Sequence, residues 1–340
     1  MLSLKPYLLQ SIAASFVLQF ISDLAYAQYP EFPPTPLVVE YDVDTTWPQR
    51  PENVKPLGAV SGISVDQDNN VWVFNRGEDQ VQVYNVDGGF VRKWEKTIVA
   101  EPHHLRIDPV GNIWLTDIGL HVVHQFSPDG KLLKTLGVSG QPGEDDMHFN
   151  APTDVAVSPE GDAFISDGYG NRRIVHYDKD GKFVKTWGTF GTQPGQFVVP
   201  HSIVMDAQGR LYVADRSGGR IQIFSQEGKF IDQWDQVMMP WGLTVTDSGD
   251  VWACGSTPYW WKRNGEFPTV KDQVLVRFGS DGRVRQIWAV PLGKEGQTRP
   301  GDFNGIHCIA QDDYGNLYVG DVFGNRAQKL TIAKDVSDSP

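Results

Sequence analysis

The chain has 340 residues and a net charge of -12, with 42 acidic and 30 basic side chains. Because nucleic-acid binding needs a basic surface that neutralises phosphates, this balance argues against DNA or RNA as a partner. The 35 glycines, 22 prolines and 11 tryptophans favour many short strands joined by tight turns over a helical fold. We therefore expect an all-β protein.

Residues 1–27 have the pattern of a secretory signal peptide. Lys5 is the only charge before an apolar-rich run from Leu8 to Ile21, and residues 25–27 (AYA) supply the small side chains that signal peptidase recognises. About 14 apolar-rich residues are fewer than the roughly 20 that a membrane span needs, which disfavours an uncleaved anchor. We expect cleavage before Gln28, a periplasmic or secreted protein, and no stable membrane span afterwards.

A sequence motif of 15 residues, called the phrase below, occurs six times along the rest of the chain. Each copy has an alternating apolar stretch, a turn rich in Asp, Asn and Gly, and a second alternating stretch, which is the pattern of a β-hairpin. The copies are SGISVDQDNNVWVFN from Ser61, HHLRIDPVGNIWLTD from His103, TDVAVSPEGDAFISD from Thr153, HSIVMDAQGRLYVAD from His201, WGLTVTDSGDVWACG from Trp241 and HCIAQDDYGNLYVGD from His307.

Most copies continue into further strands with an Asp-Gly or Glu-Gly turn, as in RIVHYDKDGKFVKTWG. Four short antiparallel strands in a repeat of about 40 to 50 residues are typical of a propeller blade. A β-sandwich would not need the same phrase six times. The pattern resembles the NHL repeat family, and it predicts a six-bladed β-propeller over residues 58–332, with an N-terminal extension at 28–57 and a C-terminal tail at 333–340.

Two longer gaps interrupt the later repeats, between Gly255 and Val274 and between Leu292 and Asn304. Insertions in a propeller usually form loops on one face, where they can cover a site. The aromatic run at residues 259–261 (YWW) forms either a lid over such a site or a plug that seals its blade.

The chain has two cysteines, Cys254 and Cys308, so no disulfide framework supports the fold. One bridge between them would suit an oxidising compartment, and two free thiols are the alternative. The sequence leaves both possibilities open.

Histidine occupies the first position of the phrase in the second, fourth and sixth repeats only, as His103, His201 and His307. Equivalent positions on alternate blades lie about 120° apart around the axis, so three imidazoles converge there. Three neutral nitrogens suit zinc or another divalent transition metal, with a fourth position open for water or substrate. His104 competes with His103 as a ligand, although the register favours His103. The remaining histidines lie off this register, namely His121, His124, His148 and His176.

The residues just after each phrase return to the same face as the three histidines, and they include Arg76, Tyr169 and Arg216. Arginine makes bidentate hydrogen bonds to carboxylates, which predicts a small-molecule or peptide-derived carboxylate as substrate. We also expect the protein to be a monomer. A tyrosine that faces two cations and a metal is suited to act as a base with a lowered pKa. The alternatives are a salt bridge from Arg216 to a turn aspartate and a packing role for Tyr169.

The segments SDGYGNRRI, VPHSI and ADRSGGRIQ resemble those of the peptidyl-α-hydroxyglycine α-amidating lyases, also called peptidylamidoglycolate lyases. The resemblance spans nearly all of the chain after residue 27. It implies a lyase reaction that splits the C–N bond of a carbinolamide into a peptide amide and glyoxylate. It also implies zinc held by His103, His201 and His307, catalysis by Tyr169, Arg76 and Arg216, and a structural calcium ion held partly by the main-chain carbonyls of Ile63 and Leu105.

The chain departs from the family pattern at four positions. Cys308 stands where the family has an aspartate after its third histidine, and Gly305 stands where it has a methionine. Asn150 and Gly170 replace a cysteine pair of the family. The aspartate supports both the calcium ion and the catalytic centre in the family, so the change at Cys308 bears directly on calcium binding and on lyase activity.

Two other functions remain open at this stage. One is a metal-dependent hydrolase on the same scaffold, such as the lactonases and esterases that usually hold calcium through Glu, Asn and Asp at the axis. The other is a non-catalytic NHL propeller that binds a protein or glycan, since a fold alone does not define chemistry.

Overall fold

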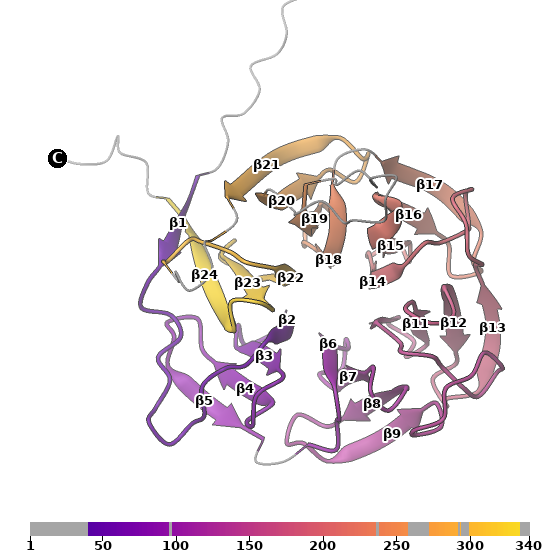
Figure 1. Ribbon diagram of the computed structural model, residues 1–340, viewed down its shortest axis with the longest axis horizontal. Coiled ribbons are helices and arrows are strands. Elements are labelled where there is room, and N and C mark those ends of the chain that lie inside the picture. The colour runs from indigo at the N-terminus through magenta and orange to yellow at the C-terminus, as the bar shows by residue number, and fades with distance from the viewer. Residues whose placement is uncertain are drawn as a thin grey trace, which may run out of the picture. The chain divides into compact units, whose positions relative to one another are not determined.

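The computed structural model describes residues 40–94, 97–235, 238–257, 272–291, 293 and 299–333. Within these ranges the strands form six four-stranded antiparallel sheets arranged around a central axis, which is a six-bladed β-propeller (Figure 1). The all-β class and the six blades expected from the repeats are confirmed. The expected signal peptide and the aromatic run at 259–261 lie outside the described residues. In the described ranges no helix is long and apolar enough to cross a membrane.

The first three blades follow the chain from the axis outward. Blade 1 contains β2 (Val60–Val65), β3 (Val71–Asn75), β4 (Val81–Tyr84) and β5 (Phe90–Lys93). Blade 2 contains β6 (Pro102–Ile107), β7 (Ile113–Asp117), β8 (Val122–Phe126) and β9 (Leu132–Leu136). Blade 3 contains β10 (Asp154–Val157), β11 (Ala163–Asp167), β12 (Arg173–Tyr177) and β13 (Phe183–Trp187).

The last three blades complete the ring. Blade 4 contains β14 (Pro200–Met205), β15 (Leu211–Asp215), β16 (Arg220–Phe224) and β17 (Phe230–Asp235), with a short 3-10 helix, η1 (Arg216–Gly218), after β15. Blade 5 contains β18 (Met239–Val245), β19 (Val251–Ser256), β20 (Asp272–Phe278) and β21 (Val284–Pro291). Blade 6 contains β22 (Ile306–Gln311), β23 (Leu317–Asp321), β24 (Arg326–Ile332) and β1 (Tyr41–Asp44).

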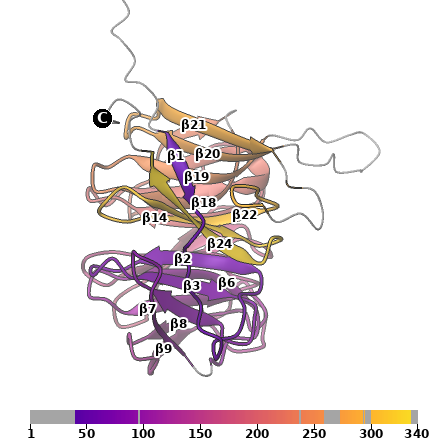
Figure 2. The ribbon, with the colours of Figure 1, turned by 90° about the vertical axis from the view of Figure 1, so that its left-hand side faces the viewer.

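The ring closes because blade 6 combines the first strand of the chain with the last three. Tyr41 lies opposite Ile332 and Asp44 lies opposite Lys329 in the antiparallel pair of β1 and β24. Figures 1 and 2 show this indigo strand beside the yellow end of the chain. The propeller therefore begins before the expected boundary at residue 58, since β1 comes from the predicted N-terminal extension and carries no copy of the repeated phrase.

The phrase has the same length in all six repeats because it forms the inner hairpin of each blade. In blade 2 the carboxylate of Asp108 accepts hydrogen bonds from the main-chain nitrogens of Val110 and Asn112 through Oδ1, and from Nε1 of Trp114 through Oδ2. Gly111 has a φ of 89°, which glycine adopts without steric cost. In blade 2 the aspartate at the sixth position thus fixes both the turn and a core tryptophan, whereas blades 3 and 5 have Ser158 and Thr246 at that position.

The core consists of apolar clusters between neighbouring blades. Between blades 1 and 2, for example, Trp72 and Phe74 pack against Leu105 and Ile113. Trp47, which follows β1, is buried at the seam between the last and first blades, with ring centroids 5.8 Å from Tyr84 and 5.0 Å from Tyr318. These contacts hold the inner strands at fixed positions around the axis.

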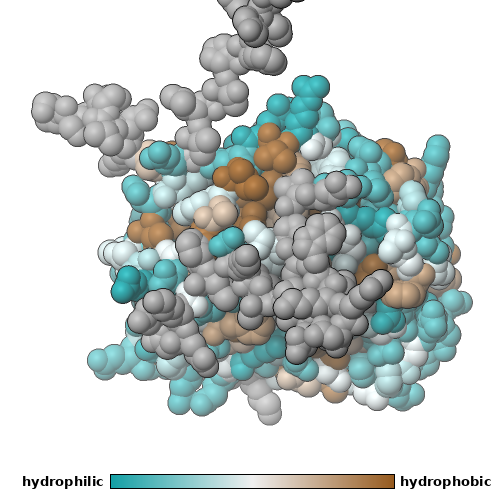
Figure 3. All heavy atoms as spheres, turned by 45° about the horizontal axis from the view of Figure 1, so that its top comes forward, coloured by the Kyte–Doolittle hydropathy of each residue, from teal (hydrophilic) through white to brown (hydrophobic). Residues whose placement is uncertain are grey.

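The outer strands of the blades expose single apolar side chains rather than a continuous apolar surface. They include Val91 on β5, Leu133 on β9, Val184 on β13, Ile231 on β17 and Ile287 on β21. On the face presented in Figure 3, brown residues occur in small groups among teal ones. Scattered apolar residues of this kind are ordinary for a protein surface.

The two cysteines lie on inner and second strands of neighbouring blades. Cys254 in β19 and Cys308 in β22 are both buried, and both are free thiols. Of the two possibilities that the sequence left open, the structure therefore has the pair unbridged.

Candidate metal centre

Three histidines converge on the axis from the starts of alternate inner strands. His103, His201 and His307 come from β6, β14 and β22, and all three are buried. Their ring centroids lie 4.8 to 4.9 Å apart. One ring nitrogen of each lies within 4.8 Å of the others, so the group could hold a metal ion. This is the convergence that the register of the repeat predicted.

The imidazole rings are oriented by main-chain carbonyls of the next blade. Each Nδ1 lies within hydrogen-bond distance of the carbonyl oxygen of the first phrase residue there: His103 to Thr153 at 2.6 Å, His201 to Trp241 at 2.6 Å and His307 to Ser61 at 2.8 Å. Because a carbonyl only accepts, Nδ1 carries the proton and Nε2 keeps its lone pair. Metal-binding histidines commonly have this arrangement.

The three imidazoles are neutral at ordinary pH. Burial lowers the pKa of His103 and His201 well below the usual 6.5, and nearby positive groups act in the same direction. The pKa of His307 falls to about 3, again chiefly through burial. Neutral imidazole is the form that binds a metal, so the site needs no proton loss before binding. Three neutral nitrogen donors fit zinc or a similar divalent transition metal.

Tyr169 stands beside the triad on the loop after β11. Its hydroxyl oxygen lies 3.0 Å from Nε2 of His103 and 3.0 Å from Nε2 of His201. Arg216, the first residue of η1, donates from Nη1 to the same oxygen at 3.3 Å. The phenol oxygen therefore lies next to the lone pairs that a metal would share.

Arg216 is held between two aromatic rings. Its guanidinium carbon lies 5.3 Å from the ring centroid of Tyr169 and 4.9 Å from that of Trp241. Such cation–π contacts fix a planar guanidinium while leaving its edge free to bind an anion. The structure thus pairs Arg216 with Tyr169 and Trp241, where the sequence had also allowed a salt bridge to a turn aspartate.

Arg76 lies at the same end of the axis but is more exposed. It follows β3, and its Nε donates to the carbonyl oxygen of Pro102 at 3.0 Å. Nη1 lies 3.5 Å from a carboxylate oxygen of Glu101, and the side chain is 33% exposed. Its charge contributes to the lowered pKa of His103 and His307. Two guanidiniums therefore flank the triad.

His104 lies next to the triad without joining it. Its ring centroid is 5.3 Å from that of His103 and 5.2 Å from that of His307. The side chain is buried, and its Nε2 has no hydrogen-bond partner among the described residues. The other four histidines have local partners: His121 with Ala151, His124 with Thr135, His148 with Asp145 and His176 with Asp162.

The positions that the resemblance assigns to calcium do not present a calcium site. The carbonyl oxygen of Leu105 accepts a hydrogen bond from Ser64 Oγ at 2.9 Å. Cys308 supplies a buried thiol whose pKa lies well above its usual value, chiefly because of burial, so it is neutral. Calcium takes roughly six to eight oxygen ligands, several of them carboxylates. With Cys308 in place of the family aspartate, Ile63 and Leu105 offer main-chain oxygens alone, which is fewer oxygen ligands than that ion takes.

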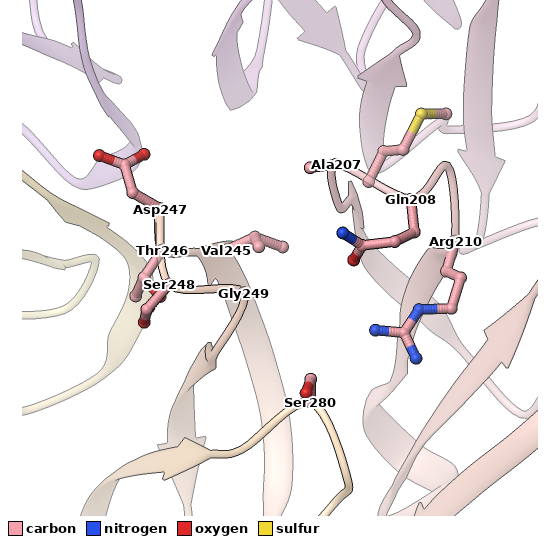
Figure 4. Close-up of a pocket in the computed structure, with 10 residues that line it drawn as sticks. Ala207, Gln208, Arg210, Val245, Thr246, Asp247, Ser248, Gly249 and Ser280 are labelled. Atoms are coloured by element: carbon pink, nitrogen blue, oxygen red, sulfur yellow. The ribbon is translucent and has the colours of Figure 1, made fainter.

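Two cavities lie at the opposite end of the axis, where the inner hairpins turn. One, of about 330 Å³, is lined by Ile63, Ser64, Arg106 and turn residues of four blades. The other, of about 770 Å³, lies between blades 4 and 5, with Gln208 and Arg210 on one side and Asp247 on the other (Figure 4). None of the three triad histidines lines either cavity.

Comparison with known proteins relates this chain to amidating enzymes. A family model described as SMP-30/Gluconolactonase/LRE-like region matches residues 105–241. Peptidyl-glycine alpha-amidating monooxygenase B of Xenopus laevis is 34% identical over 332 residues, covering 87% of this chain and 36% of that protein. A probable peptidyl-alpha-hydroxyglycine alpha-amidating lyase of Caenorhabditis elegans is 33% identical over 224 residues, covering 58% and 63%. The chain thus spans about a third of the length of the Xenopus relative.

NHL proteins and solved propellers match as well. Human NHL repeat-containing protein 3 is 33% identical over 210 residues, covering 57% of this chain and 60% of that one. Virginiamycin B lyase from Staphylococcus aureus has a TM-score of 0.56 at 18% identity, covering 86% of this chain and all of that one, which shows a shared fold alone. As the resemblance in its sequence predicted, this chain is a six-bladed propeller homologous to the peptidyl-α-hydroxyglycine α-amidating lyases and to the NHL repeat-containing proteins.

Proposed function

We propose that this protein is a metal-dependent lyase that cleaves the C–N bond of a peptidyl-α-hydroxyglycine-like carbinolamide to an amide and glyoxylate. The observation that carries the proposal is the position of the Tyr169 hydroxyl, 3.0 Å from Nε2 of both His103 and His201 and 3.3 Å from Arg216. It puts a proton acceptor, an anion-binding group and metal-ligand atoms around one point. Homologues named as amidating lyases support the class of reaction.

A zinc-type ion bound by His103, His201 and His307 would supply a Lewis acid that polarises the oxygen atoms of the substrate. The protein contributes ligands that are already neutral and already oriented by carbonyl groups. Little reorganisation is then needed when the ion binds.

The two arginines would bind the substrate carboxylate. Arg216 is fixed between the rings of Tyr169 and Trp241, and Arg76 is fixed by the carbonyl oxygen of Pro102. A guanidinium held in place binds a carboxylate with less loss of side-chain entropy than a mobile one. Binding there would set the hydroxyl-bearing carbon of the substrate beside the phenol oxygen of Tyr169.

Tyr169 would act as the base. As a phenolate, its oxygen would remove the proton of the substrate hydroxyl, and the electron pair of that O–H bond would become the second bond of the aldehyde in glyoxylate. The C–N bond would break, its electron pair would pass to the amide nitrogen, and that nitrogen would take up the proton that Tyr169 has removed. The step consumes no water and needs no oxidant, so its atoms and electrons balance with the residues present.

The hydrolase alternative shares the fold but not the chemistry of the axis. Propeller lactonases and esterases usually hold calcium with carboxylate and amide oxygens, whereas the axial donors here are imidazole nitrogens. The lyase is therefore the better supported of the two reactions. The export and the monomeric state expected from the sequence belong to the same proposal: a periplasmic or secreted enzyme that acts on a small or peptide-derived carboxylate.

The test is glyoxylate release from an N-acyl α-hydroxyglycine by the purified protein. Metal is first removed with a chelator and then restored as zinc. We expect equal amounts of amide and glyoxylate after zinc is restored, and none from His201→Ala. His176→Ala is a matched control, because that histidine bonds Asp162 on the outer part of blade 3. A zinc-loaded protein that releases no glyoxylate, but opens a lactone or an ester, would replace the lyase by a hydrolase.

A further inference from the structure

An ion pair between Arg106 and Asp154 ties together the inner strands of four consecutive blades. Arg106 in β6 donates from Nε to Oδ1 of Asp154 at 2.9 Å, and from Nη2 to Oδ2. Nη2 also donates to Ser202 Oγ at 3.0 Å, and Nη1 donates to the carbonyl oxygen of Leu243 at 3.1 Å. These partners lie in β10, β14 and β18, so one guanidinium joins blades 2, 3, 4 and 5.

The Asp154 carboxylate is fully committed within this network. Its side chain is 0% exposed, and that of Arg106 is 14% exposed. Oδ1 also accepts from the main-chain nitrogen of Val155 at 2.8 Å, and Oδ2 accepts from Ser202 Oγ at 2.8 Å and from the nitrogen of Ile203 at 3.0 Å. A carboxylate that already accepts this many bonds has no lone pair to offer a metal ion.

The partners of Arg106 are the neighbours of the groups that orient two of the triad histidines. Asp154 follows Thr153, whose carbonyl oxygen accepts from His103. Ser202 follows His201, and Leu243 comes two residues after Trp241, whose carbonyl oxygen accepts from His201. A shift of Arg106 would therefore move the carbonyls that set the direction of both Nε2 atoms.

Arg106 also lies close to the positions to which the resemblance assigns calcium. Arg106 follows Leu105 in the chain and lines the same axial cavity as Ile63. Asp154, the carboxylate that Arg106 contacts, is already neutralised by this pairing, so it does not attract a second cation. Cys308 supplies no carboxylate oxygen there, at the position where the family has an aspartate.

We propose that Arg106 is a positioning residue for the metal triad, and that its guanidinium, held by Asp154, is a built-in cation that replaces calcium on the propeller axis. Arg106 fastens the strands that carry His103 and His201, and the protein folds and binds its metal without calcium. The inference rests on the proposed metal centre and is independent of which reaction that centre performs.

Thermal unfolding of the zinc-loaded protein tests the calcium half of the proposal. The wild type should melt at the same temperature, within about 1 °C, in excess EGTA and in millimolar calcium, because a ligand stabilises only a state that binds it. Arg106→Ala should melt lower by roughly 5 to 10 °C, since it leaves a buried carboxylate unpaired. Calcium should recover part of that loss, because Asp154 and the empty channel become available. If calcium raises the melting temperature of the wild type, or fails to raise that of Arg106→Ala, the proposal that Arg106 replaces calcium is wrong.

Binding of cobalt(II) to the metal-free protein tests the positioning half, at a temperature well below melting. Arg106→Ala should weaken cobalt affinity about tenfold or more and alter its visible spectrum, as expected when groups that orient ligands are lost. Arg106→Lys, which keeps the charge, should recover part of the affinity. Arg210→Ala is the matched control: Arg210 pairs at 2.6 Å with buried Asp206, at the turn end of blade 4.

The outcomes separate this inference from the proposed reaction. Wild-type cobalt affinity in Arg106→Ala would overturn the positioning role. Tight cobalt binding by the wild type without glyoxylate release would reject the lyase and leave Arg106 as proposed. Equal loss of affinity in Arg210→Ala would assign the effect to general destabilisation and would also overturn the inference.

Discussion

The hydroxyl oxygen of Tyr169 lies 3.0 Å from Nε2 of His201, although the two residues come from different blades. The loop after β11 brings the phenol to the start of β14, so the proposed base and a proposed metal ligand share one point on the axis. Proton transfer and metal binding can therefore be tested separately, because a substitution can keep the ring of Tyr169 and remove its oxygen.

We expect Tyr169→Phe to retain bound metal and to lose activity by about 10²- to 10⁴-fold, the usual contribution of a positioned general base. The ring would keep its packing against His103 and His201. Metal content per chain and the rate of glyoxylate release are measured on the same sample. Full activity in Tyr169→Phe would assign the proton transfer to another group.

Replacing a triad histidine should remove the metal ion, which Tyr169→Phe is expected to retain. In His201→Ala we expect metal content, measured by elemental mass spectrometry, to fall from about one ion per chain toward zero, because two imidazoles hold zinc weakly. The fold should persist, since the neighbouring Ser202 and Ile203 still bond to Asp154. A variant that keeps its ion would show that the axis is not the metal site.

The convergence of the histidines was predictable because the phrase has constant length. A fixed interval between equivalent positions aligns every inner strand, so His103, His201 and His307 had to meet at the axis once six blades were recognised. The same alignment predicted Arg76, Tyr169 and Arg216 at that end. Backbone register alone therefore located these six neighbouring residues, before any side-chain direction was known.

Other parts of the site could not be predicted from the sequence. The carbonyl oxygens of Thr153 and Trp241, which orient the imidazoles, belong to the main chain and do not depend on residue type. Arg106 lies near the end of β6 and Asp154 at the start of β10, and both are charged residues, for which exposure is the ordinary expectation. Their pairing joins residues 48 positions apart in different blades, so it depends on the direction of side chains across the axis.

Closure of the ring could not be predicted either, because β1 has no copy of the phrase and pairs with a strand at the far end of the chain. Trp47 makes that closure testable. It is 5% exposed and packs on Tyr84 of blade 1 and Tyr318 of blade 6. We expect Trp47→Ala to lower the free energy of unfolding by about 3 to 5 kcal/mol in urea titrations. Tyr314→Ala, at a side chain 66% exposed, is the control and should change it little.

Buried thiol and phenol groups predict a loss of stability in alkali. Burial raises the pKa of Cys254 to about 12 from an ordinary 9.0, and raises that of Tyr84 and Tyr177 to about 12 from 10.0. Above the ordinary values the unfolded chain loses these protons while the folded protein keeps them. Unfolding then releases protons, so stability falls as the pH rises from 9.0 toward about 12.

The melting temperature measured at intervals above neutral pH checks this expectation, and Cys254→Ala should make the decline shallower. In the native protein, thiol reagents should leave Cys254 and Cys308 unmodified until denaturant is added, because both are buried. A melting temperature that stays constant up to strongly alkaline pH would contradict the prediction.

Arg216 and Arg76 should differ in how well lysine replaces them. Arg216 is planar and stacked between Tyr169 and Trp241, a contact that an ammonium group on a flexible chain does not reproduce. We expect Arg216→Lys to lower kcat/KM by about 10- to 100-fold, with both parameters affected, because the loss of a charge-assisted hydrogen bond costs about 1.5 to 3 kcal/mol. In Arg76→Lys, at a side chain 33% exposed, we expect a smaller change confined to KM. Steady-state kinetics of both variants with one α-hydroxyglycine substrate tests this difference. Equal changes of kcat and KM in the two variants would mean that the aromatic rings do not position Arg216 and that its charge alone binds the carboxylate.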